Sequence, residues 1–300
     1  MRATASTLFV RNGSSGRAAG FTLVEIAIAV FIIALLLGSI LVPLTTQVEN
    51  RNIDTTQRIL DQARDALIGY AAATGRFPCP ASDTSNGLEH FFSPGGSAAN
   101  GLCHTSVTGA AGMNVYSGFL PAATLGFTPV DASGFAVDAW GLTQNRIRYA
   151  VSRSTVNGIT NPFTRTGGMR SAGMLNIASC VQGALAAICT SPSGTSPAGG
   201  LLYVCNNGTG VTPGTNCGTA VKLTDNAPVV IWSVGPNAAT TGGVSADEAQ
   251  NPNPANPVSI DRIFVSKTRS TVAGSEFDDI VTWIGAATIF NRLIAAGQLP

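Results

Sequence analysis

A single carboxylate, that of Glu25, lies near the start of an apolar run that extends from Phe21 to Leu44. Acidic residues inside membrane-length apolar helices are rare and functional, because a charge is costly in hydrocarbon unless a partner neutralises it. The position of Glu25 inside the apolar run therefore calls for a reason. A plain membrane anchor would not need this acid.

Six cysteines form the second set of reactive residues, and all follow the apolar run. No two have C-x-x-C spacing, which argues against zinc sites and thioredoxin-like chemistry. Their even number instead indicates disulfides formed in an oxidising compartment. Spacing alone leaves many pairings open. The low closure cost of short loops favours neighbours: Cys79 with Cys103, Cys180 with Cys189, and Cys205 with Cys217.

The sequence contains no G-x-S-x-G, P-loop, H-E-x-x-H or dinucleotide-binding motif. Its two pairs of adjacent acids, Asp247-Glu248 and Asp278-Asp279, are not preset for acid–base catalysis, since neighbouring side chains on a strand face opposite ways. His90 and His104 lack metal-ligand spacing and are expected to be surface loop residues. We therefore predict that the chain is not an enzyme and has no catalytic residues.

Charged residues make up only 11% of the chain, well below the roughly 25% that is usual for soluble domains. Gly, Ser, Thr and Asn are abundant instead, a composition that suits a loop-rich extracytoplasmic domain. The net charge is +1, so no broad basic surface is available and no nucleic-acid partner is expected.

The first 20 residues contain Arg2, Arg11 and Arg17 and no acid, so this flank is expected to stay cytoplasmic. A helix from Phe21 to Leu44 would be roughly 36 Å long, enough to cross the hydrocarbon core of a membrane. A cleaved secretory signal would need a small-residue site after the apolar run. None is present there, and the small residue Gly20 precedes the run instead.

The stretch Gly20-Phe21-Thr22-Leu23-Val24-Glu25 resembles the processing motif of type IV prepilins and type II secretion pseudopilins. The resemblance covers about the first 45 residues. It implies that a prepilin peptidase cleaves after Gly20, and that the new first residue, Phe21, is N-methylated. It also implies that Glu25 neutralises the Phe21 amine of a neighbouring subunit when the helices assemble.

The expected function is that of a prepilin-like structural subunit of a type IV pilus or type II secretion pseudopilus, within the filament or at its tip. Its partners would be the prepilin peptidase, other pilin or pseudopilin subunits and the inner membrane, with the C-terminal domain in the periplasm. After assembly it would belong to a cell-surface filament or pseudopilus. The alternative is a single-pass, membrane-anchored periplasmic binding protein or hydrolase.

Downstream of the apolar run, an apolar stripe at helical spacing predicts that the helix continues to about Gly75, before Pro78. A second helix is expected over Ala286–Ala296. Between them lie long Gly/Ser/Thr/Asn/Pro tracts and five strand-like runs: Arg146–Ser152, Leu201–Cys205, Pro228–Val234, Ile263–Val265 and Asp279–Trp283.

Val137-Asp138-Ala139-Trp140-Gly141 resembles the D-x-W-G turn of the major pseudopilins, and the runs around Trp232 and Trp283 resemble their later strands. That group binds calcium in a loop before the last motif. The matching loop here has Asp247 and Glu248 but is otherwise rich in Asn and Pro. No cofactor is therefore predicted, with calcium as the open alternative. The chain is about twice as long as a major pseudopilin, which favours a minor or accessory subunit.

The predicted fold is α+β and pilin-like, with a long N-terminal helix packed on an antiparallel sheet domain that carries long disulfide-bearing loops. We expect a leader peptide at residues 1–20 and a transmembrane and filament-core helix at 21–44. The periplasmic half of that helix would follow at 45–75, and the globular domain at 76–300.

Overall fold

The computed structural model describes residues 20–104, 115–180, 188–190, 200–237, 245–252 and 262–299. The side chains of residues 37–45 are not among the described ones, and neither is most of the predicted leader, residues 1–19. The chain divides into two compact units, Met1–Asn50 and Arg51–Pro300.

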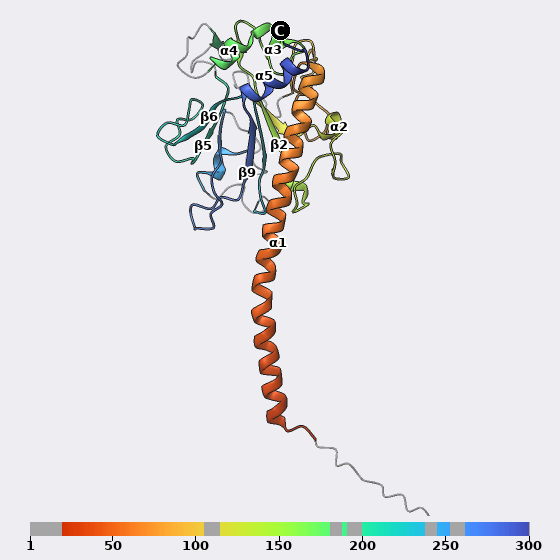
Figure 1. Cartoon of the computed structure of the whole chain (residues 1–300), viewed down its shortest axis with the longest axis vertical. Helices are drawn as coiled ribbons and strands as arrows, with labels where there is room; N and C mark the ends of the chain where they lie inside the picture. Colours follow the sequence, from red (N-terminus) through yellow and green to blue (C-terminus); the bar gives the residue numbers. More distant parts are fainter. Residues whose placement is uncertain are drawn as a thin grey trace, which may run out of the picture. The chain divides into compact units, whose positions relative to one another are not determined.

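Helix α1 spans Leu23–Thr74 and runs through the boundary between the two units (Figure 1). It ends where the sequence predicted. Gly75 follows with a φ of +72°, a conformation that suits glycine at a helix C-terminus, and its N–H donates to the carbonyl of Ala71 at 2.8 Å. The chain then leaves the helix as an extended segment that includes Cys79.

A four-stranded antiparallel sheet forms the centre of the second unit, in the order β1-β2-β7-β9. Its strands are β1 (Val115–Phe119), β2 (Arg148–Ser152), β7 (Val229–Ser233) and β9 (Ile280–Ile284). Three of these were predicted, with bounds that differ by one or two residues. The remaining strand, β1, was not among the predicted strand-like runs.

The two central strands, β2 and β7, are buried on both faces along their whole length, and this burial includes the polar Arg148 and Ser152 of β2. On one face Tyr149 and Ile231 belong to the same apolar cluster as Leu60 and Leu67 of α1. On the other face Ala150, Val230 and Trp232 pack with residues of a second sheet. The sheet is therefore the middle layer of the unit, as the ribbon also shows (Figure 1).

The second sheet has three strands in the order β6-β5-β8: β6 (Lys222–Ala227), β5 (Leu202–Cys205) and β8 (Ile263–Val265). Strands β5 and β6 are antiparallel, whereas β8 runs parallel to β5. The expectation of a wholly antiparallel domain was therefore wrong at β8. A parallel pair needs a long connection, and here β6 and β7 lie between the two strands in the sequence.

Short elements complete the described fold. A two-stranded ladder joins β3 (Thr155–Val156) to β4 (Cys189–Thr190). Helix α5 (Ala286–Ala295) confirms the predicted C-terminal helix and buries Ile289 and Leu293 in the same cluster as residues of α1. The remaining helical elements are α2 (Ala122–Leu125), α3 (Gly168–Ala172), α4 (Met174–Ala178) and the 3₁₀ turns η1 (Thr143–Asn145) and η2 (Glu248–Gln250).

The six cysteines form the three disulfides that short-loop closure favoured: Cys79–Cys103, Cys180–Cys189 and Cys205–Cys217. Each closes a loop between elements rather than joining the two sheets. A bridge of this kind stabilises a domain by about 2–4 kcal/mol, which helps a chain with many Gly-rich connections.

Candidate functional site

Helix α1 begins with a reciprocal pair of hydrogen bonds between Thr22 and Glu25. The Glu25 Oε2 atom accepts from the backbone N–H of Thr22 at 2.9 Å and from its hydroxyl at 2.8 Å. The Thr22 hydroxyl accepts from the N–H of Glu25 at 3.3 Å. This arrangement is a capping box, in which each side chain satisfies a backbone donor of the first turn. The T-x-x-E spacing is visible in the sequence, but the cap was not predicted.

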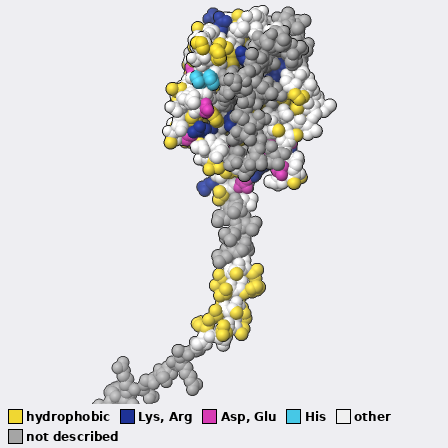
Figure 2. Space-filling model, turned by 180° about the vertical axis from the view of Figure 1, so that it is seen from behind, with side chains coloured by type: hydrophobic (Ala, Val, Ile, Leu, Met, Phe, Trp, Pro, Cys, Tyr) yellow, Lys and Arg dark blue, Asp and Glu magenta, His cyan; other side chains and the backbone are white. Residues whose placement is uncertain are grey.

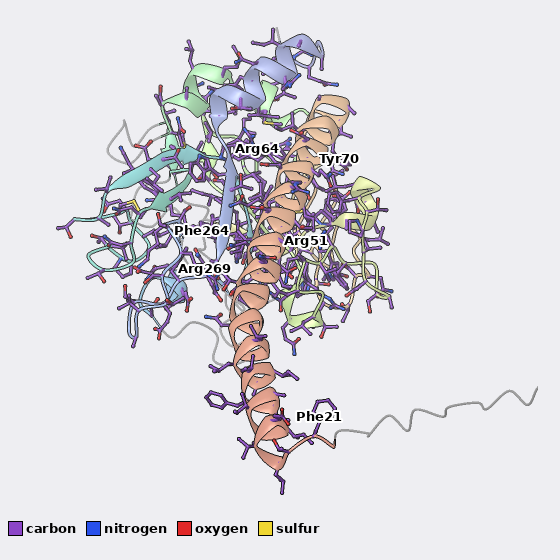
Figure 3. All side chains as sticks on the ribbon, turned by 60° about the horizontal axis from the view of Figure 1, so that its bottom comes forward. Phe21, Arg51, Arg64, Tyr70, Phe264 and Arg269 are labelled. Carbon is purple, nitrogen blue, oxygen red and sulfur yellow. A yellow bond between two sulfur atoms is a disulfide. The ribbon has the colours of Figure 1, made fainter. Side chains whose placement is uncertain are left out.

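The residues around this cap are exposed within their own unit. Phe21 has 82% of its surface exposed, and its ring lies beside the first turn of α1 (Figure 3). Large apolar side chains from Leu23 to Leu36 are likewise uncovered (Figure 2). A Cβ atom added to Gly20 would meet no atom within 4 Å. Packing in this structure therefore does not require glycine at that position.

No helix within the described residues is both long and apolar enough to cross a membrane. Part of the predicted span, residues 37–44, lies outside the side chains that the structure describes.

The D-x-W-G segment forms the tight turn that was predicted, with the N–H of Gly141 donating to the carbonyl of Asp138 at 3.2 Å. The buried Asp138 carboxylate accepts hydrogen bonds from Ser233 at 2.6 Å and from Asn145 at 3.0 Å, and burial raises its pKa. Trp140 of this turn is half-buried. This turn therefore organises the ends of β2 and β7 rather than presenting a reactive group.

In each pair of adjacent acids the two carboxylates have different partners, and one acid of each pair, Glu248 and Asp278, contacts the other. Glu248 and Asp278 are linked by a hydrogen bond of 3.2 Å from the N–H of Asp278 to Glu248 Oε1. Asn237 contacts both, donating from its side chain to Glu248 at 3.2 Å and from its backbone to Asp278 at 3.1 Å. Burial raises the pKa of Asp278 to about 7, and the nearby Glu248 adds to the rise.

The other two acids have separate partners. Asp247 receives hydrogen bonds from the Lys267 ammonium and from the N–H of Gly208. Asp279 accepts from the side chain of Asn251 at 2.8 Å, and burial raises its pKa well above the ordinary value.

The described residues of the Asp247 loop provide no support for the calcium alternative. The Asp247 carboxylate is already neutralised by Lys267. Across the described part of the chain, no group of three or more His, Cys, Asp or Glu side chains could hold a metal ion. Residues 238–244 and 253–261, which flank the loop, lie outside the description.

The Asp278 carboxyl predicts a pH dependence of stability. Its pKa rises from 3.8 to about 7 on folding, so the folded state holds this proton more tightly than the unfolded state. Its stabilising contribution is complete below about pH 4 and is lost as the pH rises through about 7. Asp278→Asn should flatten this fall, which a series of thermal melts between these pH values would measure. A loss of about 1 kcal/mol corresponds to about 2–4 °C in a domain of this size.

Asp225→Asn is the matched control, because Asp225 lies in an ion pair with Lys222 whose side chain is 53% exposed. It should leave the pH profile close to that of the wild type. A profile that is equally steep in Asp278→Asn and the wild type would contradict the assignment.

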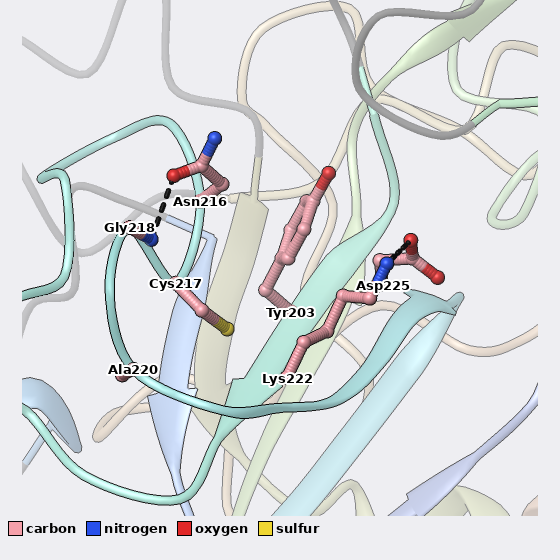
Figure 4. Close-up of a pocket in the computed structure, with 7 residues that line it drawn as sticks. All are labelled: Tyr203, Asn216, Cys217, Gly218, Ala220, Lys222 and Asp225. Carbon is pink, nitrogen blue, oxygen red and sulfur yellow. Dashed lines mark hydrogen bonds and ion pairs between the residues drawn. The ribbon is translucent and has the colours of Figure 1, made fainter.

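A hollow of about 290 Å³ lies over β5, β6 and the disulfide loop between them (Figure 4). Its polar groups are already engaged: the Lys222 and Asp225 side chains pair at 2.5 Å, and Asn216 accepts from the N–H of Gly218 at 2.8 Å. Its lining residues are Tyr203, Asn216, Cys217, Gly218, Ala220, Lys222 and Asp225. These lining residues include no nucleophile–base pair.

The two histidines lie in loop segments, as predicted, but they contact each other, which was not predicted. His90 and His104 are half-buried, and their rings stack with centroids 4.2 Å apart and planes 5° from parallel. The spacing of 14 positions in the sequence gave no signal for this contact, which depends on how the loop pairs with itself.

No protein family model, curated protein or solved structure matches this chain significantly.

Proposed function

We propose that this chain is a prepilin-like structural subunit, which a prepilin peptidase cleaves after Gly20 and which then assembles into, or at the tip of, a type IV pilus or type II secretion pseudopilus. The observation that carries this proposal is the Gly20-Phe21 junction directly before an apolar run, with Glu25 as the run's early acid. Gly, Phe and Glu occupy the motif positions without a gap.

Two features of the helix start support the proposal. Gly20 is not needed for packing, whereas a peptidase requires a small residue at the bond it cleaves. The large side chains from Phe21 to Leu36 are exposed, and exposed apolar residues on a helix need a bilayer or neighbouring helices to cover them.

The same proposal places the helix of residues 21–44 in the inner membrane and the C-terminal domain in the periplasm. The three disulfides are consistent with an oxidising compartment. The subunit would act through assembly with other pilin or pseudopilin subunits rather than as an enzyme.

The second candidate function is a membrane-anchored periplasmic binding protein, and the hollow beside Tyr203 is the one observation that favours it. The two functions differ in the mature N-terminus. A simple anchor would keep its leader, whereas a pilin subunit would lose it.

Mass spectrometry of the mature protein should find an N-methylated Phe21 as the first residue. Gly20→Leu should abolish processing and leave the full-length precursor in the membrane, because a bulky side chain blocks access to the scissile peptide bond. Gly16→Leu, four residues upstream in the leader, is the matched control and should be processed normally. A wild-type protein that starts at any other residue would disprove the proposal.

A further inference from the structure

The only two histidines of the chain meet on a short antiparallel ladder. Phe91 and Cys103 form an antiparallel bridge, and the N–H of His104 donates to the carbonyl of His90 at 2.8 Å. His90 and His104 are thus cross-strand neighbours, whose side chains lie on the same side of the ladder. The Cys79–Cys103 disulfide holds the adjacent position.

We propose that His90 and His104 form a two-imidazole site for a divalent cation of the zinc, copper and nickel class. Two nitrogen ligands of a tetrahedral zinc ion, each at about 2.0–2.1 Å, are about 3.3 Å apart. The ring centroids are 4.2 Å apart. Because the ring planes are nearly parallel, both side chains must rotate out of the stack before one nitrogen of each can point at a shared ion.

A ring nitrogen on each histidine is available for a ligand bond. The Nδ1 atom of His90 lies 2.6 Å from the hydroxyl of Ser82, which leaves Nε2 as its ligand atom. Such a hydrogen bond on the opposite nitrogen is the usual way in which a metal-binding imidazole is oriented. The Nδ1 atom of His104 is buried and has no hydrogen-bond partner among the described residues.

Metal binding requires an imidazole nitrogen that carries no proton. Glu89, which directly precedes His90, does not compete for the site, since both of its carboxylate oxygens contact the Arg76 guanidinium. Two cationic rings at this separation would also repel each other.

The donor atoms define the class of cation. Imidazole nitrogen suits zinc, copper and nickel, whereas calcium and magnesium prefer oxygen ligands. The neighbouring Cys103 supplies no thiolate ligand, because its sulfur is held in a disulfide. Both imidazoles lie together at the surface of the domain (Figure 2), and the ring rotation that the site requires would also uncover the buried Nδ1 atom of His104.

Calorimetric titration of the full chain with Zn²⁺ tests the proposal, using detergent-solubilised protein without a histidine tag at about pH 7.5. One saturable site is expected. His90→Gln and His104→Gln should each weaken binding at least about tenfold, and so should Ser82→Ala, which removes the orienting hydroxyl. Asp225→Asn, remote in sequence and paired with Lys222, should bind like the wild type. At about pH 5, binding should be lost because protons compete for the rings.

Imidazole NMR signals provide a readout that does not depend on the variants. The chain has two histidines, so two signals are expected and both should shift together with Zn²⁺ but not with Mg²⁺. The proposal is overturned if wild-type protein shows no saturable Zn²⁺ binding, if only one signal shifts, or if both histidine variants bind as tightly as the wild type.

Discussion

Glu89→Ala is expected to destabilise the domain by about 3–5 kcal/mol, because it would leave the buried Arg76 guanidinium without its counter-ion. Arg76 has only 6% of its surface exposed. Its two terminal nitrogens contact the two oxygens of Glu89 at 2.8 and 2.7 Å, a bidentate pair. Removal of one partner of such a pair costs more than the pair contributes.

Hydrogen bonds join this pair to the end of α1, to the segment that contains Cys79 and to α2. Arg76 donates to the hydroxyl of Tyr70 on α1 at 2.9 Å, and Glu89 accepts from the N–H of Cys79 at 3.1 Å. The N–H of Glu89 donates to the hydroxyl of Thr124 on α2 at 2.7 Å. Burial and the Glu89 charge raise the pKa of Tyr70, so the phenol stays neutral. Loss of Glu89 should therefore loosen the attachment of α1 to the disulfide loop.

Chemical denaturation of the variant, monitored by tryptophan fluorescence, would measure the effect. Asp225→Ala is the control, since its ion pair with Lys222 is solvent-exposed and such pairs contribute about 0–1 kcal/mol. Replacement of both members, Arg76→Met with Glu89→Leu, should recover much of the lost stability. Equal losses in Glu89→Ala and Asp225→Ala would show that the Arg76–Glu89 pair is not effectively buried.

Local sequence patterns predicted the elements that depend only on residues close to them in sequence. The end of α1 at Gly75 follows from a glycine and a proline in close succession, and β7 follows from an apolar run bounded by turn residues. Strand β6 was missed because its sequence, Lys222–Ala227, is polar and lies at a sheet edge, where few side chains are buried. Strand β1 was missed because its five residues include a serine and a glycine.

The candidate sites also divide into those that local sequence indicates and those that depend on contacts between distant segments. Glu25 was identified from its position in an apolar run, and the cap to Thr22 is a local spacing that the sequence could also have indicated. The contact between Glu248 and Asp278 was not predictable, because it joins a loop to the start of β9. The stacking of His90 on His104 likewise depends on tertiary pairing.

Glu25→Ala is expected to abolish incorporation into filaments while leaving membrane insertion and cleavage intact. If Glu25 neutralises the Phe21 amine of a neighbour, its loss leaves that amine unpaired where the helices pack. Insertion should not suffer, because an apolar helix is easier to insert without the carboxylate. Cleavage should persist, because the scissile bond precedes Phe21. Immunoblotting of sheared filaments and of membranes for the variant would separate these steps.

The capping box supplies the control that this experiment needs. In the described structure Glu25 has a second role, since its carboxylate accepts both hydrogen bonds from Thr22 at the start of α1. Thr22→Ala removes the threonine side of the cap but keeps the charge of Glu25, and Glu25→Gln keeps hydrogen bonding but removes the charge. If the charge is what assembly requires, Thr22→Ala should assemble nearly as the wild type, and Glu25→Gln should be impaired, though less than Glu25→Ala. Equal defects in Thr22→Ala and Glu25→Ala would instead assign Glu25 to helix capping, and normal filament recovery of Glu25→Ala would remove the electrostatic argument for assembly.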